Sequence, residues 1–143
     1  MTQEPAKKKK KTLIAIGKRK KAIARAVITE GTGKFTVNKR AIDSIDSKYR
    51  KLRIKEPIII AGELANGVDV SVSVKGGGIW GQTDACRTAI ANALVSWSKS
   101  DTLKYAYTDY DRSLLVSDSR RTEPHKPSRS TAGPRRSKQQ SKR

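Results

Sequence analysis

Alternating apolar and polar positions predict several β-strands. The clearest strand runs from Val68 to Val74, with four valines on one face and an aspartate and two serines on the other. After a turn at Gly31 to Gly33, Lys34 to Val37 alternates in the same way. Thr12 to Ile16 and Ala22 to Thr29 are also rich in β-formers, and they form either two strands or one long strand with a break.

Apolar residues at three- and four-residue steps predict two helices in the second half of the chain. The first helix follows Gly76-Gly77-Gly78 and carries an apolar stripe between Ile79 and Trp97, and the second spans Asp101 to Tyr110. Strands followed by helices that pack on one face of a sheet give an α+β fold.

The stretch between the early strands and Val68 is less clearly patterned. We expect a short helix over Ala41 to Tyr49, because Ile42 and Ile45 are three residues apart. Tyr49 to Ala61 is ambiguous between a helix and a buried strand, and Pro57 is expected to interrupt whichever forms.

Charge divides the chain into three parts. The 143 residues include 32 Lys+Arg and 13 Asp+Glu, a formal net charge of +19. Residues 1–21 and 112–143 each carry a net charge of +8, whereas residues 22–111 carry only +3. We therefore expect a basic, disordered N-terminal extension over 1–11, an α+β domain over 12–111 and an extended basic tail over 112–143.

The C-terminal tail lacks the residues needed to fold alone. The 27 residues after Val116 contain one aliphatic side chain and no aromatic one, so we expect them to stay disordered until a partner orders them. A basic run can simply keep a protein soluble, but acidic residues would serve that purpose as well. Cationic arms at both ends therefore favour a polyanionic partner whose phosphates they neutralise.

Composition argues against several other classes of protein. No stretch approaches the roughly 20 apolar residues of a membrane span, and the N-terminus has no apolar core of a secretory signal. A single cysteine, Cys86, fits a reducing cytoplasmic setting, and with the single His125 it is too little for a Cys/His zinc site. Acidic residues are scattered singly, so no specific pattern supports carboxylate acid–base catalysis, and we expect no cofactor.

One glycine motif suggests nucleotide binding. Gly76 to Gly81 satisfies G-x-G-x-x-G, and the stretch through Thr83 nearly matches a P-loop, with Gln82 in place of the lysine. Dinucleotide binding also needs a second parallel strand after the helix, and residues 99–113 offer none. The glycines form either a tight strand-to-helix turn or a place where a helix N-terminus meets polynucleotide phosphate.

Three further side chains could carry chemistry, but core packing is the favoured interpretation of each. Cys86 lies on the apolar helix stripe and is expected to be a buried hydrophobe rather than a reactive thiol. Trp80 and Trp97 could stack on bases, yet we expect both to be buried.

Four blocks of sequence follow one another in a specific order and spacing. They are Ala15 to Ala26, the glycine-containing stretch Val74 to Leu94, Asp111 to Pro124 with its Thr122-Glu123-Pro124, and the C-terminal Ser141-Lys142-Arg143. Together they span about residues 13–143, and the chain resembles the small-subunit ribosomal protein S9 family, with the Thr-Glu-Pro form similar to archaeal members.

The resemblance implies both a fold and a set of partners. Family members have an α+β domain with a small mixed sheet, similar to the second domain of ribosomal protein S5. They bind 16S-type rRNA in the head of the small subunit beside other head proteins, and their C-terminal tip approaches P-site tRNA. The implied role is that of a structural, cytoplasmic ribosomal protein with no catalytic step; a free basic RNA chaperone is the alternative.

Carried over by position, the resemblance also implies two sets of binding residues. The rRNA-binding set is Lys18, Arg19, Lys20, Lys21, Gly76, Gly77, Gly78, Arg112, Arg120, Arg121, Arg129, Arg135, Arg136 and Lys138, and the tRNA-binding pair is Lys142 and Arg143. Relatives on this branch usually have Tyr before the final Arg, so Lys142 is a departure. The run Lys7 to Lys11 lies outside the resemblance and indicates only a polyanion partner.

Overall fold

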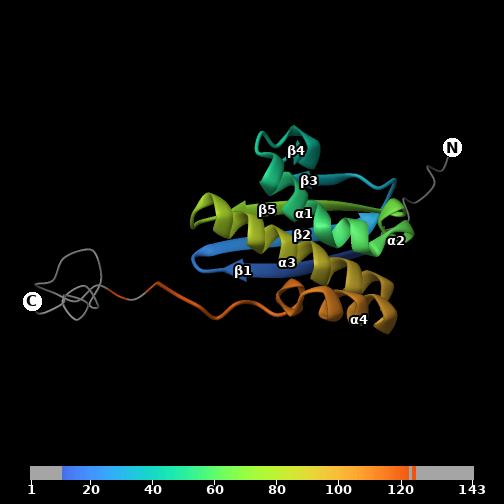
Figure 1. Ribbon diagram of the computed structural model, residues 1–143. Helices are drawn as coiled ribbons and strands as arrows, with labels where there is room; N and C mark the ends of the chain where they lie inside the picture. The colour runs from blue at the N-terminus through green and yellow to red at the C-terminus, as the bar shows by residue number, and fades with distance from the viewer. Residues whose placement is uncertain (1–10, 123, 125–143) are drawn as a thin grey trace, which may run out of the picture.

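A five-stranded sheet forms one layer of the molecule (Figure 1). The structure is a computed structural model that describes residues 11–122 and 124. Its strands are β1 (Thr12–Arg19), β2 (Ala22–Glu30), β3 (Phe35–Val37), β4 (Arg40–Ala41) and β5 (Val68–Lys75), in the spatial order β1-β2-β5-β3-β4. β3 and β5 run parallel and all other neighbours antiparallel, so the sheet is mixed, as the resemblance implied.

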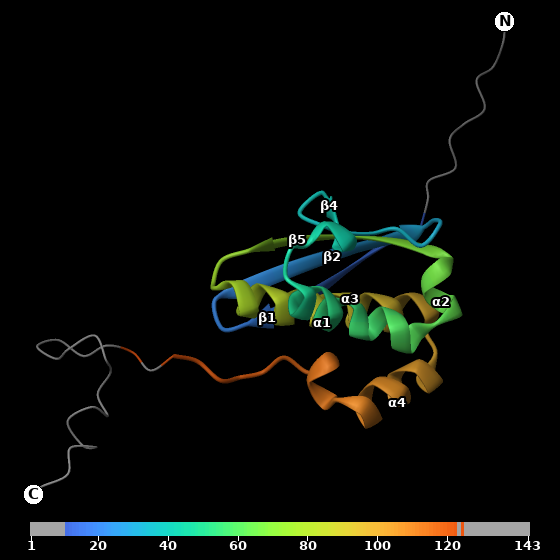
Figure 2. The same cartoon turned by 45° about the horizontal axis from the view of Figure 1, so that its top comes forward.

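Helices cover one face of this sheet (Figure 2). They are the 3-10 helix η1 (Ile42–Ser44), α1 (Lys48–Ala61), α2 (Glu63–Asn66), α3 (Ile79–Ser98), α4 (Asp101–Tyr110) and the 3-10 helix η2 (Arg112–Leu114). The long helix α3 packs on β1, β2 and β5, α1 lies beside α3, and α4 contacts both helices. The α+β prediction is confirmed. Within the described part of the chain, no helix has the length and apolarity needed to cross a membrane.

β1 and β2 form a hairpin, so the ambiguous N-terminal region is two strands. The pairing of Arg19 with Ala22 leaves only Lys20-Lys21 in the turn. β1 continues through Gly17, and α3 crosses closely over the strand at this residue. A Cβ atom on Gly17 would lie 2.1 Å from the backbone oxygen of Ala85, which only glycine avoids.

The strand and helix predictions with strong periodicity are confirmed. The four valines of β5 are all buried, and β3 follows the predicted glycine turn. α3 and α4 lie where the apolar spacing placed them. Their buried faces belong to one core with the alanines of β2: α3 packs directly on the sheet, and α4 packs on α1 and α3.

The expected helix over Ala41 to Tyr49 is wrong. Ala41 pairs with Thr36 in the sheet, and only the single 3-10 turn η1 follows before the backbone becomes extended again at Ile45. Of the two isoleucines that suggested a helix, Ile42 is buried in the core from this turn, and Ile45 packs against the core just after it. Tertiary pairing with β3 therefore overrides the local apolar spacing.

Tyr49 to Ala61 is helical, and the expectation that Pro57 interrupts it is wrong. α1 continues through Pro57 to Ala61. Pro57 is buried, and its carbonyl oxygen accepts a 2.6 Å hydrogen bond from the hydroxyl of Tyr107 on α4. The packing of α1 against α3 and α4 outweighs the loss of one intrahelical hydrogen bond.

Of the three side chains expected in the core, one is not there. Cys86 is 1% exposed, and burial raises the pKa of its thiol to about 12, so it packs as a hydrophobe. Trp97 is half-buried against the core, and the Lys11 ammonium lies 4.9 Å from the centre of its ring. Trp80 is 56% exposed, which corrects the prediction: the first turn of α3 extends beyond the edge of the core.

Candidate nucleic-acid interface

Two turns meet at one end of the sheet. These are the β1–β2 turn at Lys20-Lys21 and the β5–α3 turn at Gly76-Gly77-Gly78. A Cβ atom on Gly76 would lie 2.6 Å from the Lys21 oxygen, and one on Gly77 would lie 2.8 Å from the Ala22 nitrogen. Both glycines also have positive φ, 78° and 65°. Glycine is therefore required at both positions for the two backbones to touch.

Exposed cations surround these turns. We call the group the cationic turn face, and it consists of Lys18, Lys20, Lys21, Arg25 and Lys75. The strand register places Lys18 of β1 and Lys75 of β5 on either side of β2, both in line with its Ile23. Among the described residues, none of the five cations forms a salt bridge within the protein. Their charges are free to contact phosphate.

The predicted site missed two members of this face, Arg25 and Lys75. Both lie on the sheet face opposite the helices, which also exposes Ile14, Ile16 and Ile23. The period-two pattern of β2 carried the signal, since Arg25 shares a face with Ile23 and Lys21. Lys75 required the strand pairing, because it is distant from them in sequence.

Arg19 differs from its neighbours because its side chain turns toward the helices. Its Nη1 lies 3.0 Å from an oxygen of Asp118 and its Nε lies 3.7 Å from Asp84 of α3. Asp118 also binds Arg120, and hydrogen bonds from Arg120 followed by the charge of Arg19 hold its pKa well below the ordinary value. Arg19 therefore ties the segment after η2 to the end of β1.

A second tie fixes η2 on α3. Arg87 is 3% exposed, and its guanidinium contacts Glu56 of α1 and donates a 2.9 Å hydrogen bond to Asp111. Burial acts to raise the pKa of Asp111, but hydrogen bonds from Ser113 and Arg87 outweigh it and keep that pKa low. Leu114 then packs fully buried in the core.

These two ties set the direction of the chain after η2. The segment that follows Leu114 runs toward the β1–β2 turn in both views (Figures 1 and 2). Arg120 and Arg121 are exposed along it, and Arg112 is exposed in η2 just before it. The predicted binding residues Arg129, Arg135, Arg136, Lys138, Lys142 and Arg143, and most of the tail expected to be disordered, lie outside the described residues.

The fold around the glycine motif lacks the strand–helix–strand unit that binds dinucleotides. β5 is the last strand of the described chain, so no parallel strand follows α3. Gln82, in the lysine position of a P-loop, donates a hydrogen bond of 3.1 Å to the Gly76 carbonyl and so braces the turn. The turn is an exposed strand-to-helix connection beside the cationic turn face.

Fold and charge together define a class: a small α+β protein whose described residues include exposed, unpaired cations and whose sequence ends in a basic segment. The family model described as ribosomal protein S9/S16 matches residues 17–143, and the chain belongs to this family. The resemblance drawn from the sequence is thereby confirmed.

Named relatives support the same assignment. A small ribosomal subunit protein uS9 from Methanococcus vannielii is 50% identical over 131 residues, which is 92% of this chain and 98% of that protein. A uS9 protein from Methanothrix thermoacetophila is 45% identical over 116 residues, covering 81% of this chain and 88% of its own length. The similarity to archaeal sequences thus extends over nearly the whole chain.

Proposed function

We propose that this chain is a structural component of the small ribosomal subunit and binds 16S-type rRNA in the subunit head. The observation that carries the proposal is the cationic turn face, whose five exposed charges have no partner within the described protein. Membership of the S9/S16 family supports rRNA as the polyanion. The proposed role has no catalytic step.

The physical basis of rRNA binding is charge neutralisation on a rigid support. Lysine and arginine contacts to phosphate position a protein without reading sequence. The glycines of the β5–α3 turn lack side chains, and Gly78 has no atom near the position of a Cβ, so an RNA backbone can approach the start of α3. Specificity then comes from the shape of the folded RNA.

Within this interface the arginines divide into two roles. Arg112, Arg120 and Arg121 are exposed and are proposed to contact rRNA, together with Arg129, Arg135, Arg136 and Lys138 further along the tail. Arg19 already contacts two carboxylates. We propose that it acts mainly by positioning the segment that carries the other arginines.

The last two residues are proposed to contact P-site tRNA. Lys142 and Arg143 are cations at the end of the tail, and a contact to tRNA phosphates would hold any tRNA regardless of its anticodon. We also propose that the chain contacts neighbouring proteins of the subunit head and that it acts in the cytoplasm.

The cationic turn face is tested by neutralising two of its lysines. The double variant Lys20→Gln with Lys21→Gln should weaken binding to small-subunit rRNA roughly 3- to 10-fold at physiological salt. The slope of log K against log salt concentration should also become shallower, by the amount expected for the loss of up to two phosphate contacts. Filter binding across a salt series and co-sedimentation with reconstituted subunits provide the measurement.

The matched control is Lys99→Gln with Lys104→Gln, which removes the same charge from the C-terminal end of α3 and from α4. An equal loss in both double variants would contradict a localised interface. Binding that moderate salt removes entirely would instead indicate a free RNA chaperone.

A further inference from the structure

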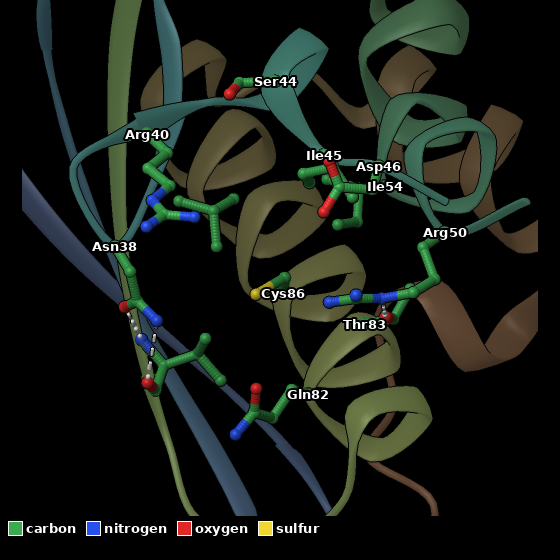
Figure 3. Close-up of a pocket in the computed structure, with 12 residues that line it drawn as sticks. Asn38, Arg40, Ser44, Ile45, Asp46, Arg50, Ile54, Gln82, Thr83 and Cys86 are labelled. Carbon is green, nitrogen blue, oxygen red and sulfur yellow. Dashed lines mark hydrogen bonds between the residues drawn. The ribbon is translucent and has the colours of Figure 1, made fainter. Parts of the chain in front are cut away.

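A cavity of about 400 Å³ lies on the helix-covered side of the sheet, between the β3–β4 hairpin and helices α1 and α3 (Figure 3). Its size falls within the range of small-molecule sites. The hairpin supplies Asn38 and Arg40, η1 and the residues after it supply Ser44 and Asp46, and α1 supplies Arg50. α3 supplies Gln82, Thr83 and Cys86.

The hairpin wall is held rigidly in place. Asn38 and Lys39 both have positive φ, 48° and 67°, as a two-residue type I′ turn requires. The Asn38 side chain accepts a hydrogen bond from the Val74 nitrogen at 2.9 Å and donates one to the Val74 oxygen at 3.3 Å. Its own backbone nitrogen donates to Val72. The turn is thus fixed to β5, and it holds the backbone of Arg40 in place at the edge of the cavity.

Two arginines face this cavity from opposite walls. Figure 3 shows Arg40 extending from the hairpin and Arg50 from α1, with the Cys86 sulfur between them. Arg50 donates from Nε to the Thr83 hydroxyl at 3.3 Å, which orients its guanidinium across the opening. Within the described chain neither arginine forms a salt bridge, although Asp46 also lines the rim.

Part of the cavity lining is apolar. Val37, Ile45, Ile54, Val74 and Cys86 form this part. A phosphate ion alone would interact with the arginines and leave the apolar lining unused. A flat heterocycle joined to a phosphate would contact both. The Gln82 side chain and the Asp46 carboxylate add polar groups that can meet the edge of a base.

From this combination we propose that the cavity takes one unstacked nucleotide of the bound RNA. The base packs against the apolar part of the lining, and Arg40 and Arg50 contact its flanking phosphates. Sequence-specific RNA recognition relies on such unstacked bases, so this cavity would add base readout to the phosphate contacts made elsewhere. The inference rests on the proposed function, namely that the chain binds rRNA.

Chemical probing of base edges in reconstituted small subunits tests the proposal. Subunits are assembled with the wild-type chain, with Arg50→Gln, with Ser44→Trp or with Lys104→Gln, and treated with dimethyl sulfate and carbodiimide. Ser44 is an exposed residue of the rim, so S44W fills the opening without changing charge. We expect one unpaired base, protected in wild-type subunits, to become severalfold more reactive with both R50Q and S44W and to stay protected with K104Q.

Two results would overturn the proposal: no base that responds to both cavity variants, or the same responses with K104Q. Thermal melts of the free chain with millimolar nucleoside monophosphates form the second arm. A stabilisation by free nucleotide that R50Q and S44W remove, with no base in the subunits responding to both variants, would overturn RNA as the source of the ligand. Failure of the wild-type chain to enter subunits at all would contradict the proposed function itself, and this inference with it.

Discussion

Gly77 shows how a single residue controls the end of the sheet that carries the cationic turn face. Its φ is 65°, and a Cβ atom there would lie 2.8 Å from the Ala22 nitrogen and 3.1 Å from the Ala22 Cβ. Gly77→Ala should therefore destabilise the protein by about 2 kcal/mol, from the left-handed backbone and from the displaced β1–β2 turn. Urea denaturation monitored by far-UV circular dichroism measures this change in the free energy of unfolding.

The neighbouring glycine provides a control. Gly78 has φ of −96° and no atom within 4 Å of an added Cβ. Gly78→Ala should leave stability within about 0.5 kcal/mol of the wild type. Equal destabilisation by the two alanines would show that the contact between the turns is unimportant.

Arg87 shows what reasoning from sequence misses at the residue scale. It lies on α3 among apolar residues, and its carboxylate partners Glu56 and Asp111 are 31 and 24 positions away in the sequence. The apolar spacing of α3 predicted which face is buried. The spacing did not indicate that an arginine is buried there, because the carboxylates that compensate for burying its charge come from other elements.

At the scale of elements, a single hydrogen bond links α4 to α1. Tyr107 is fully buried, and burial raises the pKa of its phenol, so it donates as a neutral hydroxyl to the Pro57 oxygen. Tyr107→Phe should lower the free energy of unfolding by about 1–2 kcal/mol, because it leaves a buried carbonyl without this donor. Thermal and urea denaturation of the full chain measure the loss.

Tyr105 on the same helix is the matched control, since it is 73% exposed. Tyr105→Phe should change stability by less than about 0.5 kcal/mol. If the two phenylalanine variants were equally stable, the α4–α1 hydrogen bond would contribute nothing.

The elements that sequence predicted poorly are those whose conformation depends on distant partners. Ala41 belongs to the sheet only because Thr36 pairs with it, and α1 runs through Pro57 because helices α3 and α4 pack around it. β5 and α3 were predictable, since each has a full periodic face that can be buried in only one way.

At the scale of the whole molecule, the charge is concentrated toward the ends of the chain. The central residues 22–111 are near neutral, and the segments before and after them each carry a net charge of +8. The hairpin of β1 and β2 and the Arg19–Asp118 ion pair bring parts of both basic segments to one end of the sheet. Two charge runs far apart in sequence thereby converge.

The proposed contact of the C-terminal tip with tRNA gives a prediction at this scale. Deleting Lys142 and Arg143 should leave incorporation into small subunits intact and increase the rate at which P-site tRNA dissociates, because two phosphate contacts are lost. Unchanged dissociation rates in subunits that contain the truncated chain would contradict the proposal. Quantifying the chain in gradient-purified subunits checks that assembly is normal.

The sequence alone determined the class of fold, the strongest strand and helices, the partition of charge and the resemblance to the S9 family. These depend on local periodicity, on composition and on motif order, which can be read without knowing long-range contacts. Tertiary structure alone decided that Lys75 joins the cationic turn face, that Arg19 turns inward, and that a cavity forms between Arg40 and Arg50. Each of these depends on residues from different elements meeting in space, and strand register and helix packing set that geometry.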